Sequence, residues 1–182
     1  MKTIGILALQ GGYDAHAKVV SKIGLKPVLV RNPEELTTLD GMIFPGGEST
    51  TMLKLLKRFK FFDALQQWLR RGKPVFGTCA GLILLANSVR NPKQESLGWL
   101  DVTVNRNGWG RQLDSFEATD DSGKYPLCFI RAPRIKALGP EVEVLATYQG
   151  EPICVRQGNI TAAAFHPELT ESTALHREIF LD

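Results

Sequence analysis

The sequence predicts an α/β domain with an open, mainly parallel β-sheet, helices on both faces and a small antiparallel extension. Two observations lead to this prediction. In the first half of the chain, short segments that are apolar throughout alternate with segments of helical periodicity. Strands of that kind are buried on both faces, which is typical of a parallel sheet covered by helices and joined by right-handed crossovers. In the second half, short strand-like segments follow one another with turn residues between them, which favours antiparallel pairing.

The first half contains the predicted parallel core. Its four strands cover residues 4–9, 27–30, 41–44 and 75–77. A helical pattern follows the first strand and continues to Ile23, where Gly24 ends it. A second helix begins where Ser49 or Thr50 provides a cap. Two more helices are predicted at 62–69 and 80–86.

The second half supplies the predicted extension. Its strands cover 101–104, 115–118, 127–130, 142–146, 153–156 and 160–165, and a closing helix covers 172–180. The segment 91–96 is predicted to be an exposed loop. No linker, repeat or low-complexity segment interrupts the sequence, so residues 1–182 are expected to form a single domain, which suits the length of 182 residues.

Composition and charge argue against several classes of function. The formal net charge of +3, from 22 basic and 19 acidic residues, is too small to indicate binding to nucleic acid or a membrane surface. No apolar stretch reaches the roughly 18 residues of a membrane-spanning helix, and no signal peptide is recognisable, so we expect a cytoplasmic protein. The three cysteines form no CxxC pair, which argues against a disulfide framework and a zinc site. We expect no metal and no cofactor.

The segment 77–81, Gly-Thr-Cys-Ala-Gly, ends one apolar run and opens the next. Small residues around a cysteine are what a sharp strand-to-helix turn requires, because bulk beside the nucleophile would clash. In such a turn the sulfur of Cys79 is exposed at the sheet edge, and the positive end of the following helix dipole favours the thiolate. Cys79 is therefore the candidate nucleophile. Cys128 and Cys154 lie inside predicted strands, where buried, inert thiols are expected.

A cysteine nucleophile needs a base and a group that orients the base. His166 follows an apolar strand directly, so it lies at the carboxyl edge, where open α/β sheets bind ligands. Glu168 lies two residues further, across the stiff Pro167, and can accept from one imidazole nitrogen while the other faces the thiol. An incidental surface turn is the alternative. His16 is expected to be a capping or interface residue, and His176 to lie on a solvated helix face.

Segment 45–48, Pro-Gly-Gly-Glu, follows the third predicted strand. Its two glycines allow the backbone to approach a ligand closely and to aim N–H groups at it. The segment is either an ordinary turn or, beside a cysteine nucleophile, an oxyanion donor together with the Ala80 N–H; one such donor is typically worth about 3 kcal/mol of barrier. Arg106 and Arg131 lie in segments bounded by glycine or proline, and are either solvated or positioned to hold a carboxylate.

Together, these segments resemble the class I (triad-type) glutamine amidotransferase family, whose members carry a P-G-G loop, a G-x-C-x-G elbow and an H-P-E segment in this order on a flavodoxin-like fold. Within that family the sequence is similar to the glutaminase subunits of pyridoxal 5′-phosphate synthases. The segments that carry this likeness are 7–11, 45–51, 77–81, 110–117, 129–133 and 166–170. The likeness covers nearly the whole chain.

The resemblance implies hydrolysis of L-glutamine to L-glutamate and ammonia through a cysteine thioester. Cys79 would attack the amide, His166 would transfer protons, and Glu168 would orient His166. The N–H groups of Gly47 and Ala80 would bind the oxyanion. The substrate-binding positions implied by the family are Gly46, Gly47, Glu48, Arg106, Ile130 and Arg131.

The resemblance also implies a partner. The ammonia would pass to the synthase subunit of a hetero-oligomeric pyridoxal 5′-phosphate synthase for vitamin B6 biosynthesis, with Gln10 at the interface. Low activity is expected without that partner, because an uncoupled glutaminase would waste glutamine.

Other functions fit the sequence less well. A glutaminase for another synthase, such as one for histidine or purine precursors, is disfavoured by segments 110–117 and 129–133. A protease or deglycase-like protein would place an acidic residue near the cysteine and would lack the H-P-E turn. A regulatory binding protein would not need an intact Cys79, His166 and Glu168.

Overall fold

The computed structural model describes residues 1–107 and 116–182, and its main sheet is largely parallel. The strands of this sheet are β1 (Thr3–Leu7), β2 (Lys26–Val30), β3 (Gly41–Phe44), β4 (Val75–Thr78), β10 (Glu143–Tyr148), β11 (Glu151–Gln157) and β12 (Ile160–Ala163). Their order across the sheet is β10-β11-β12-β4-β3-β1-β2. The five strands from β12 to β2 are parallel, whereas β11 pairs antiparallel with both β12 and β10. The predicted fold class is confirmed.

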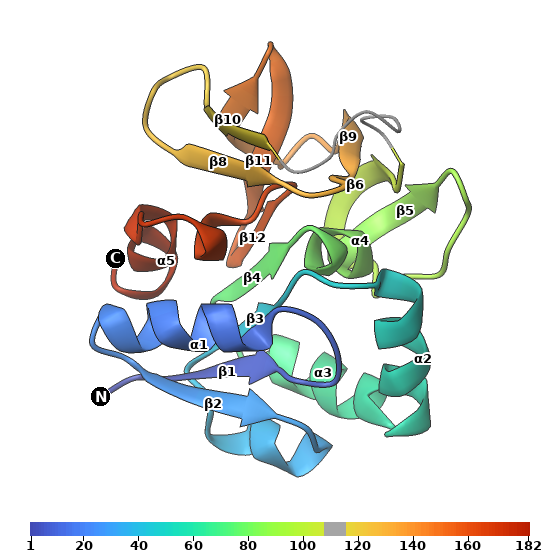
Figure 1. Ribbon diagram of the computed structural model, residues 1–182. Coiled ribbons are helices and arrows are strands. Elements are labelled where there is room, and N and C mark those ends of the chain that lie inside the picture. The colour runs from blue at the N-terminus through green and yellow to red at the C-terminus, as the bar shows by residue number, and fades with distance from the viewer. Residues whose placement is uncertain (108–115) are drawn as a thin grey trace.

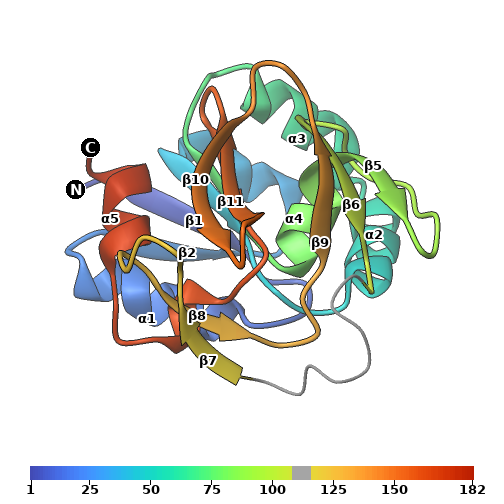
Figure 2. The same cartoon turned by 90° about the horizontal axis from the view of Figure 1, so that it is seen from above.

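Helices cover both faces of this sheet (Figures 1 and 2). They are α1 (Tyr13–Lys22), α2 (Ser49–Arg58), α3 (Phe61–Leu69), α4 (Ala80–Leu85) and α5 (Ala174–Phe180), with 3₁₀ turns η1 (Pro33–Thr38) and η2 (Pro167–Leu169). Helices α1 and α5 lie on one face, and α2, α3 and α4 lie on the other. Within residues 1–107 and 116–182, no helix is long and apolar enough to cross a membrane.

Two small sheets make up the rest of the extension. One contains β5 (Ala86–Arg90), β6 (Leu100–Asn105) and β9 (Arg134–Leu138), and the other pairs β7 (Phe116–Thr119) with β8 (Pro126–Phe129). Strands β5 and β9 were not predicted, because their alternating burial is incomplete and they contain several polar residues. Residue 115, at the start of the predicted strand 115–118, lies outside the described residues. The remaining predicted strands are present with small shifts of their ends, but β12, which was predicted in the antiparallel extension, belongs to the parallel core because it pairs with β4.

The central strands are buried because helices cover them on both sides. All four residues of β3 and of β4 are buried, and Trp68 of α3 is among the largest fully buried side chains. Strand β4 is in register with both neighbours, so that Gly77 pairs with Phe44 of β3, and Thr78 pairs with Ala163 of β12. The three strands therefore end at the same level, and the loops that follow them meet at one edge of the sheet.

Candidate active site

The cysteine lies in a strained turn between β4 and α4. Cys79 has φ 51° and ψ −101°, a conformation that non-glycine residues adopt rarely and that is typical of a nucleophile elbow. Its N–H donates to the carbonyl of Ala163 at 2.8 Å, so β12 holds the turn in place. A Cβ at Gly81 would lie 2.0 Å from the Phe44 carbonyl oxygen, which explains the glycine two residues after the cysteine. The side chain of Cys79 reaches the candidate cavity from the end of β4, but Cys79 is buried, so the prediction of an exposed sulfur was wrong.

His166 and Glu168 lie in the turn that follows β12. The distance from His166 Nδ1 to Glu168 Oε1 is 2.7 Å, and the side chain of Glu168 is almost fully buried. The His166 N–H donates to the Cys128 carbonyl at 2.8 Å, which ties this turn to β8. The other imidazole nitrogen remains available for Cys79, with which His166 also forms a hydrogen bond.

Electrostatics favour a cationic imidazole beside a carboxylate. Burial alone would lower the pKa of His166, but the hydrogen bonds with Cys79 and Glu168 outweigh burial and raise that pKa to about 10. Burial alone would raise the pKa of Glu168, but the neighbouring His16 and the hydrogen bond with His166 keep it below its usual value. His166 is therefore protonated and Glu168 ionised at neutral pH. A cation beside a thiol stabilises negative charge that develops on sulfur.

The loop after β3 packs directly against the imidazole. A Cβ at Gly46 would lie 2.3 Å from His166 Cε1, so only glycine fits this approach. The Gly46 carbonyl accepts from the Gly12 N–H at 2.9 Å, and this bond fixes the peptide unit that carries the Gly47 N–H. The Glu48 N–H donates to Gln10 Oε1 at 2.9 Å. Both ends of the loop are thus held by the segment that follows β1.

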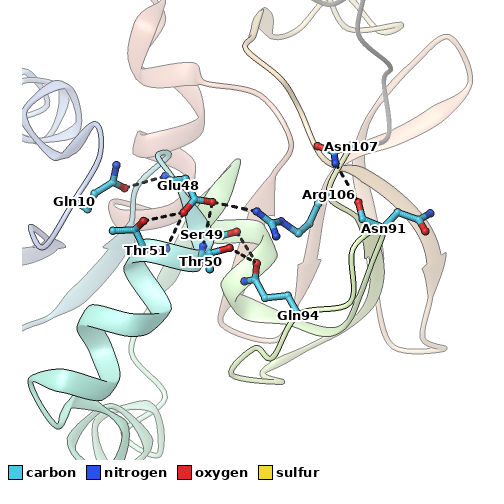
Figure 3. Close-up of polar contacts among 9 residues, drawn as sticks. All are labelled: Gln10, Glu48, Ser49, Thr50, Thr51, Asn91, Gln94, Arg106 and Asn107. Carbon is cyan, nitrogen blue, oxygen red and sulfur yellow. Dashed lines mark hydrogen bonds and ion pairs between the residues drawn. The ribbon is translucent and has the colours of Figure 1, made fainter.

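Glu48 connects the loop to α2 and to Arg106 (Figure 3). Its carboxylate accepts from the N–H groups of Thr50 and Thr51 at 3.3 and 2.8 Å. Glu48 is therefore the N-cap, and the prediction of Ser49 or Thr50 as the cap was wrong. The hydroxyls of Ser49 and Thr50 donate instead to Gln94 Oε1, at 3.0 and 3.3 Å.

The same carboxylate pairs with Arg106 of the segment after β6, at 3.1 Å between Oε1 and Nη2 (Figure 3). Burial opposes ionisation of Glu48, but the hydrogen bonds from Thr51 and Thr50 and the charge of Arg106 together outweigh burial and lower its pKa. Two predicted substrate-binding side chains thus contact each other, and together they join α2 to the second sheet.

A cavity of about 320 Å³ lies where these groups meet, which is within the range that binds small molecules. It is lined by Gly12, Gly46, Gly47, Cys79, Ile130, Arg131, His166, Glu168 and Leu169. The predicted residues Ile130 and Arg131 close it from the end of β8, where Cys79 Sγ lies 3.9 Å from the Ile130 carbonyl oxygen. Sequence reasoning missed Gly12 and Leu169 as lining residues, although Gly12 directly follows the selected segment 7–11 and Leu169 lies within the selected segment 166–170.

The structure buries both remaining histidines. His176 was predicted on a solvated helix face, but it is fully buried, and this prediction was wrong. His16 is also fully buried, between α1 and the end of β4, and it caps no helix. Cys154 is fully buried, and burial raises its pKa to about 12, whereas Cys128 is half-buried. Across the described parts of the chain, no cluster of three or more His, Cys, Asp or Glu side chains could hold a metal ion.

The fold and this site define a glutamine amidotransferase. A solved structure described as a glutamine amidotransferase superposes with a TM-score of 0.90 at 42% identity, covering 97% of this chain and 96% of its own. Another glutamine amidotransferase, from Thermotoga maritima, shares the fold alone, at a TM-score of 0.62 and 14% identity over 100% of this chain and 83% of its own.

More narrowly, the chain belongs to the SNO glutamine amidotransferase family, whose model matches residues 6–182. Similar relatives are pyridoxal 5′-phosphate synthase subunits PdxT. The one from Thermotoga maritima is 49% identical over 96% of this chain and 95% of its own length. The one from Koribacter versatilis is 50% identical over 98% of this chain and 93% of its own length.

Proposed function

We propose that the chain is a single glutaminase domain, residues 1–182, that uses Cys79, His166 and Glu168 as a catalytic triad to hydrolyse L-glutamine to L-glutamate and ammonia. The ammonia goes to the synthase subunit of a pyridoxal 5′-phosphate synthase in the cytoplasm. The observation that carries this proposal is the path from Glu168 Oε1 to His166 Nδ1, at 2.7 Å, and on to Cys79 beside one cavity.

In the first half of the reaction, Cys79 Sγ attacks the side-chain amide carbon of glutamine as a thiolate, its proton being held by the imidazolium of His166. The carbonyl oxygen becomes an oxyanion, and a C–S bond forms. Collapse of this intermediate breaks the C–N bond while His166 gives a proton to the leaving nitrogen, which departs as ammonia. Glu168 keeps the imidazole in the orientation that this transfer needs.

In the second half, water attacks the thioester carbon. His166 takes a proton from that water, the C–S bond breaks, and glutamate leaves with Cys79 restored. The same imidazole thus acts first as an acid and then as a base. A strong hydrogen bond to Glu168 suits both steps, because it stabilises the imidazolium each time it forms.

The backbone groups at the cavity suit the oxyanion and the substrate. The N–H groups of Gly47 and Ala80 are the proposed oxyanion donors, since they follow the ends of the adjacent strands β3 and β4. The proposed substrate contacts are Gly46, Gly47, Glu48, Arg106, Ile130 and Arg131. For Glu48 and Arg106, the ion pair that they form suits a role in fixing the rim of the site.

Gln10 is the proposed link to the synthase. Its side-chain oxygen accepts the Glu48 N–H, so a partner that moves Gln10 moves the oxyanion loop as well. This arrangement explains why docking would control the activity.

The test is glutamine hydrolysis by the complex with the synthase subunit. Cys79→Ala should abolish turnover, whereas Cys128→Ala, which removes a half-buried thiol from β8, should retain it. Retained turnover in Cys79→Ala would overturn the proposed mechanism. A wild-type complex that forms no glutamate from glutamine would overturn the function.

A further inference from the structure

Two buried histidines lie behind the candidate triad, and the proposed reaction does not use them. His16 of α1 and His176 of α5 are both fully buried, and His16 Nδ1 lies 3.0 Å from His176 Nε2. On its other side, His16 Nε2 lies 3.0 Å from Thr78 Oγ1 and 3.5 Å from Glu168 Oε1. A chain of side chains therefore leads from the last helix to the triad carboxylate and to the residue before the nucleophile.

The two rings are also held by an aromatic neighbour. Phe76 of β4 meets His16 edge-to-face, with ring centroids 6.1 Å apart and planes at 89°. It meets His176 in the same way, at 5.3 Å and 88°. Such packing restricts rotation of both imidazoles, so their nitrogens face fixed partners.

Both imidazoles are neutral at physiological pH. Complete burial lowers the pKa of His16; Glu168 opposes this effect and His166 reinforces it. Burial, reinforced by the neighbouring His16, lowers the pKa of His176 to about 3. A neutral imidazole carries one N–H donor and one acceptor nitrogen, so the direction of the hydrogen bonds has to be consistent along the chain.

The carboxylate sets that direction. Because ionised Glu168 only accepts hydrogen bonds, the His16 nitrogen that faces it has to carry the proton. His16 Nδ1 is then an acceptor, and His176 Nε2–H donates to it. His176 Nδ1 becomes a bare acceptor, which fits its lack of a partner within the described residues. The opposite direction would bury an unpaired N–H on His176 and aim a lone pair at the carboxylate, and buried N–H groups without a partner are rare.

We infer that His16 and His176 are positioning residues of the glutaminase: His176 donates to His16, and His16 donates to Glu168 and Thr78, so that the carboxylate is fixed against His166. The inference rests on the proposed function. It gives both histidines a role in catalysis without contact with glutamine. His16 also lies close to both Glu168 and Thr78 at the end of β4. The triad carboxylate and the turn that carries the nucleophile are therefore aligned by the same side chain.

The groups that face Glu168 come from several elements. His166 binds it from the preceding turn, His16 faces it from α1, and His176 acts on it from α5. Cys128 of β8 is close enough for the charge of Glu168 to raise the pKa of its thiol, and Cys79 is linked to Glu168 through His166. Of these groups, His16 and His166 both act to hold the pKa of Glu168 down. Losing the His16 donor should therefore raise the pH at which Glu168 gains a proton.

Kinetics of the complex with the synthase subunit test the inference. His16→Leu removes the donor, whereas His16→Gln keeps an N–H close to the position of Nε2. We expect His16→Leu to lower kcat about tenfold or more with KM for glutamine within about twofold, because a lost hydrogen bond to a charged group acts on the transition state. The acid limb of the pH profile should move to higher pH. His16→Gln should recover most of both changes, and His176→Leu should show a smaller loss of the same kind.

Unchanged kcat and pH profile in His16→Leu would overturn the inference while the wild-type complex still hydrolyses glutamine, which leaves the proposed function intact. A second result would also overturn the inference: kcat falls equally in His16→Leu and His16→Gln, the unfolding temperature falls with it, and the acid limb of the pH profile does not shift. That result would show that His16 contributes only through its packing.

The tautomers give a test that needs no variant. In ¹⁵N-labelled wild-type protein, long-range ¹H–¹⁵N correlation spectra should show the Nε2–H form for both His16 and His176, without titration from about pH 5 to 8. An Nδ1–H form of His16, or protonation of either ring within that range, would overturn the proposed direction of donation.

Discussion

The two walls of the cavity are built differently. One wall consists of Gly46, Cys79 and His166, each within three residues of the end of a buried parallel strand of the main sheet. The opposite wall consists of Ile130 and Arg131, which follow β8 of a two-stranded sheet and are exposed. The side chain of Arg106, beyond the end of β6, has Glu48 as its only charged partner among the described residues.

From this contrast we predict that the first wall governs the chemistry and the second wall governs binding. The ends of β3, β4 and β12 are level and tightly packed, so groups placed there have little freedom to move. Ile130 and Arg131 follow a two-stranded sheet, and the nearby rim outside the cavity lining is held by the ion pair of Arg106 with Glu48 at the start of α2. Changes at the first wall should therefore act on kcat, and changes at the second wall should act mainly on KM.

The largest effect is expected at Gly46. In Gly46→Ala, the new Cβ would lie 2.3 Å from His166 Cε1, so the imidazole or the loop has to shift. Because His166 is the proposed acid and base, we expect kcat in the complex to fall about 10²-fold or more. The kcat is measured from steady-state glutamine hydrolysis by the complex, and the unfolding temperature of the variant shows whether it is folded. A kcat within threefold of wild type, in a folded variant, would contradict the claim that this wall is rigid.

An intermediate effect is expected at Arg106. Arg106→Gln removes the cation that pairs with Glu48 while keeping a polar side chain. We expect KM for glutamine to rise about tenfold with kcat changed less than about twofold, because the rim of the site loosens but the triad stays in place. Lys57→Gln, which breaks the exposed pair with Glu95, is the matched control and should change neither constant. A fall in kcat with unchanged KM would reverse the assignment of the two walls.

The smallest effect is expected in the pH dependence of stability. The pKa of His166 is raised to about 10 in the folded chain, above the usual value of 6.5 in the unfolded chain. The stability that protonated His166 contributes is therefore complete below about pH 6.5 and is lost as the pH rises towards 10. Denaturant unfolding of the free chain over this range should show a steeper fall for wild type than for His166→Asn. Parallel curves would show that His166 is not held as a cation.

The same contrast explains what the sequence could predict. The sequence alone identified Cys79, His166 and the Gly46-Gly47 pair. Each of them follows an apolar strand, in a short segment whose residue types are compatible with few backbone conformations. The parallel core was predictable for the same reason, since its strands are apolar throughout.

The remaining features depend on contacts between segments far apart in the sequence. His16 and His176 are separated by 160 residues, and nothing near His176 indicates that α5 buries it against α1. Glu48 acts as an N-cap, a position at which glutamate is not among the preferred residues, so Ser49 and Thr50 were the more plausible caps from sequence alone. Strands β5 and β9 form only because β6 pairs with both of them.

Covalent labelling with a glutamine-mimicking electrophile is the sharpest test of Cys79 as the nucleophile of a partner-dependent glutaminase. The complex with the synthase subunit is treated with a diazoketone analogue of glutamine, and its peptides are read by mass spectrometry. We predict that Cys79 alone is modified, that glutamine slows the modification, and that labelling is much slower without the synthase. Modification of Cys128 or Cys154 instead, or an unlabelled Cys79 in a complex that still hydrolyses glutamine, would contradict this assignment.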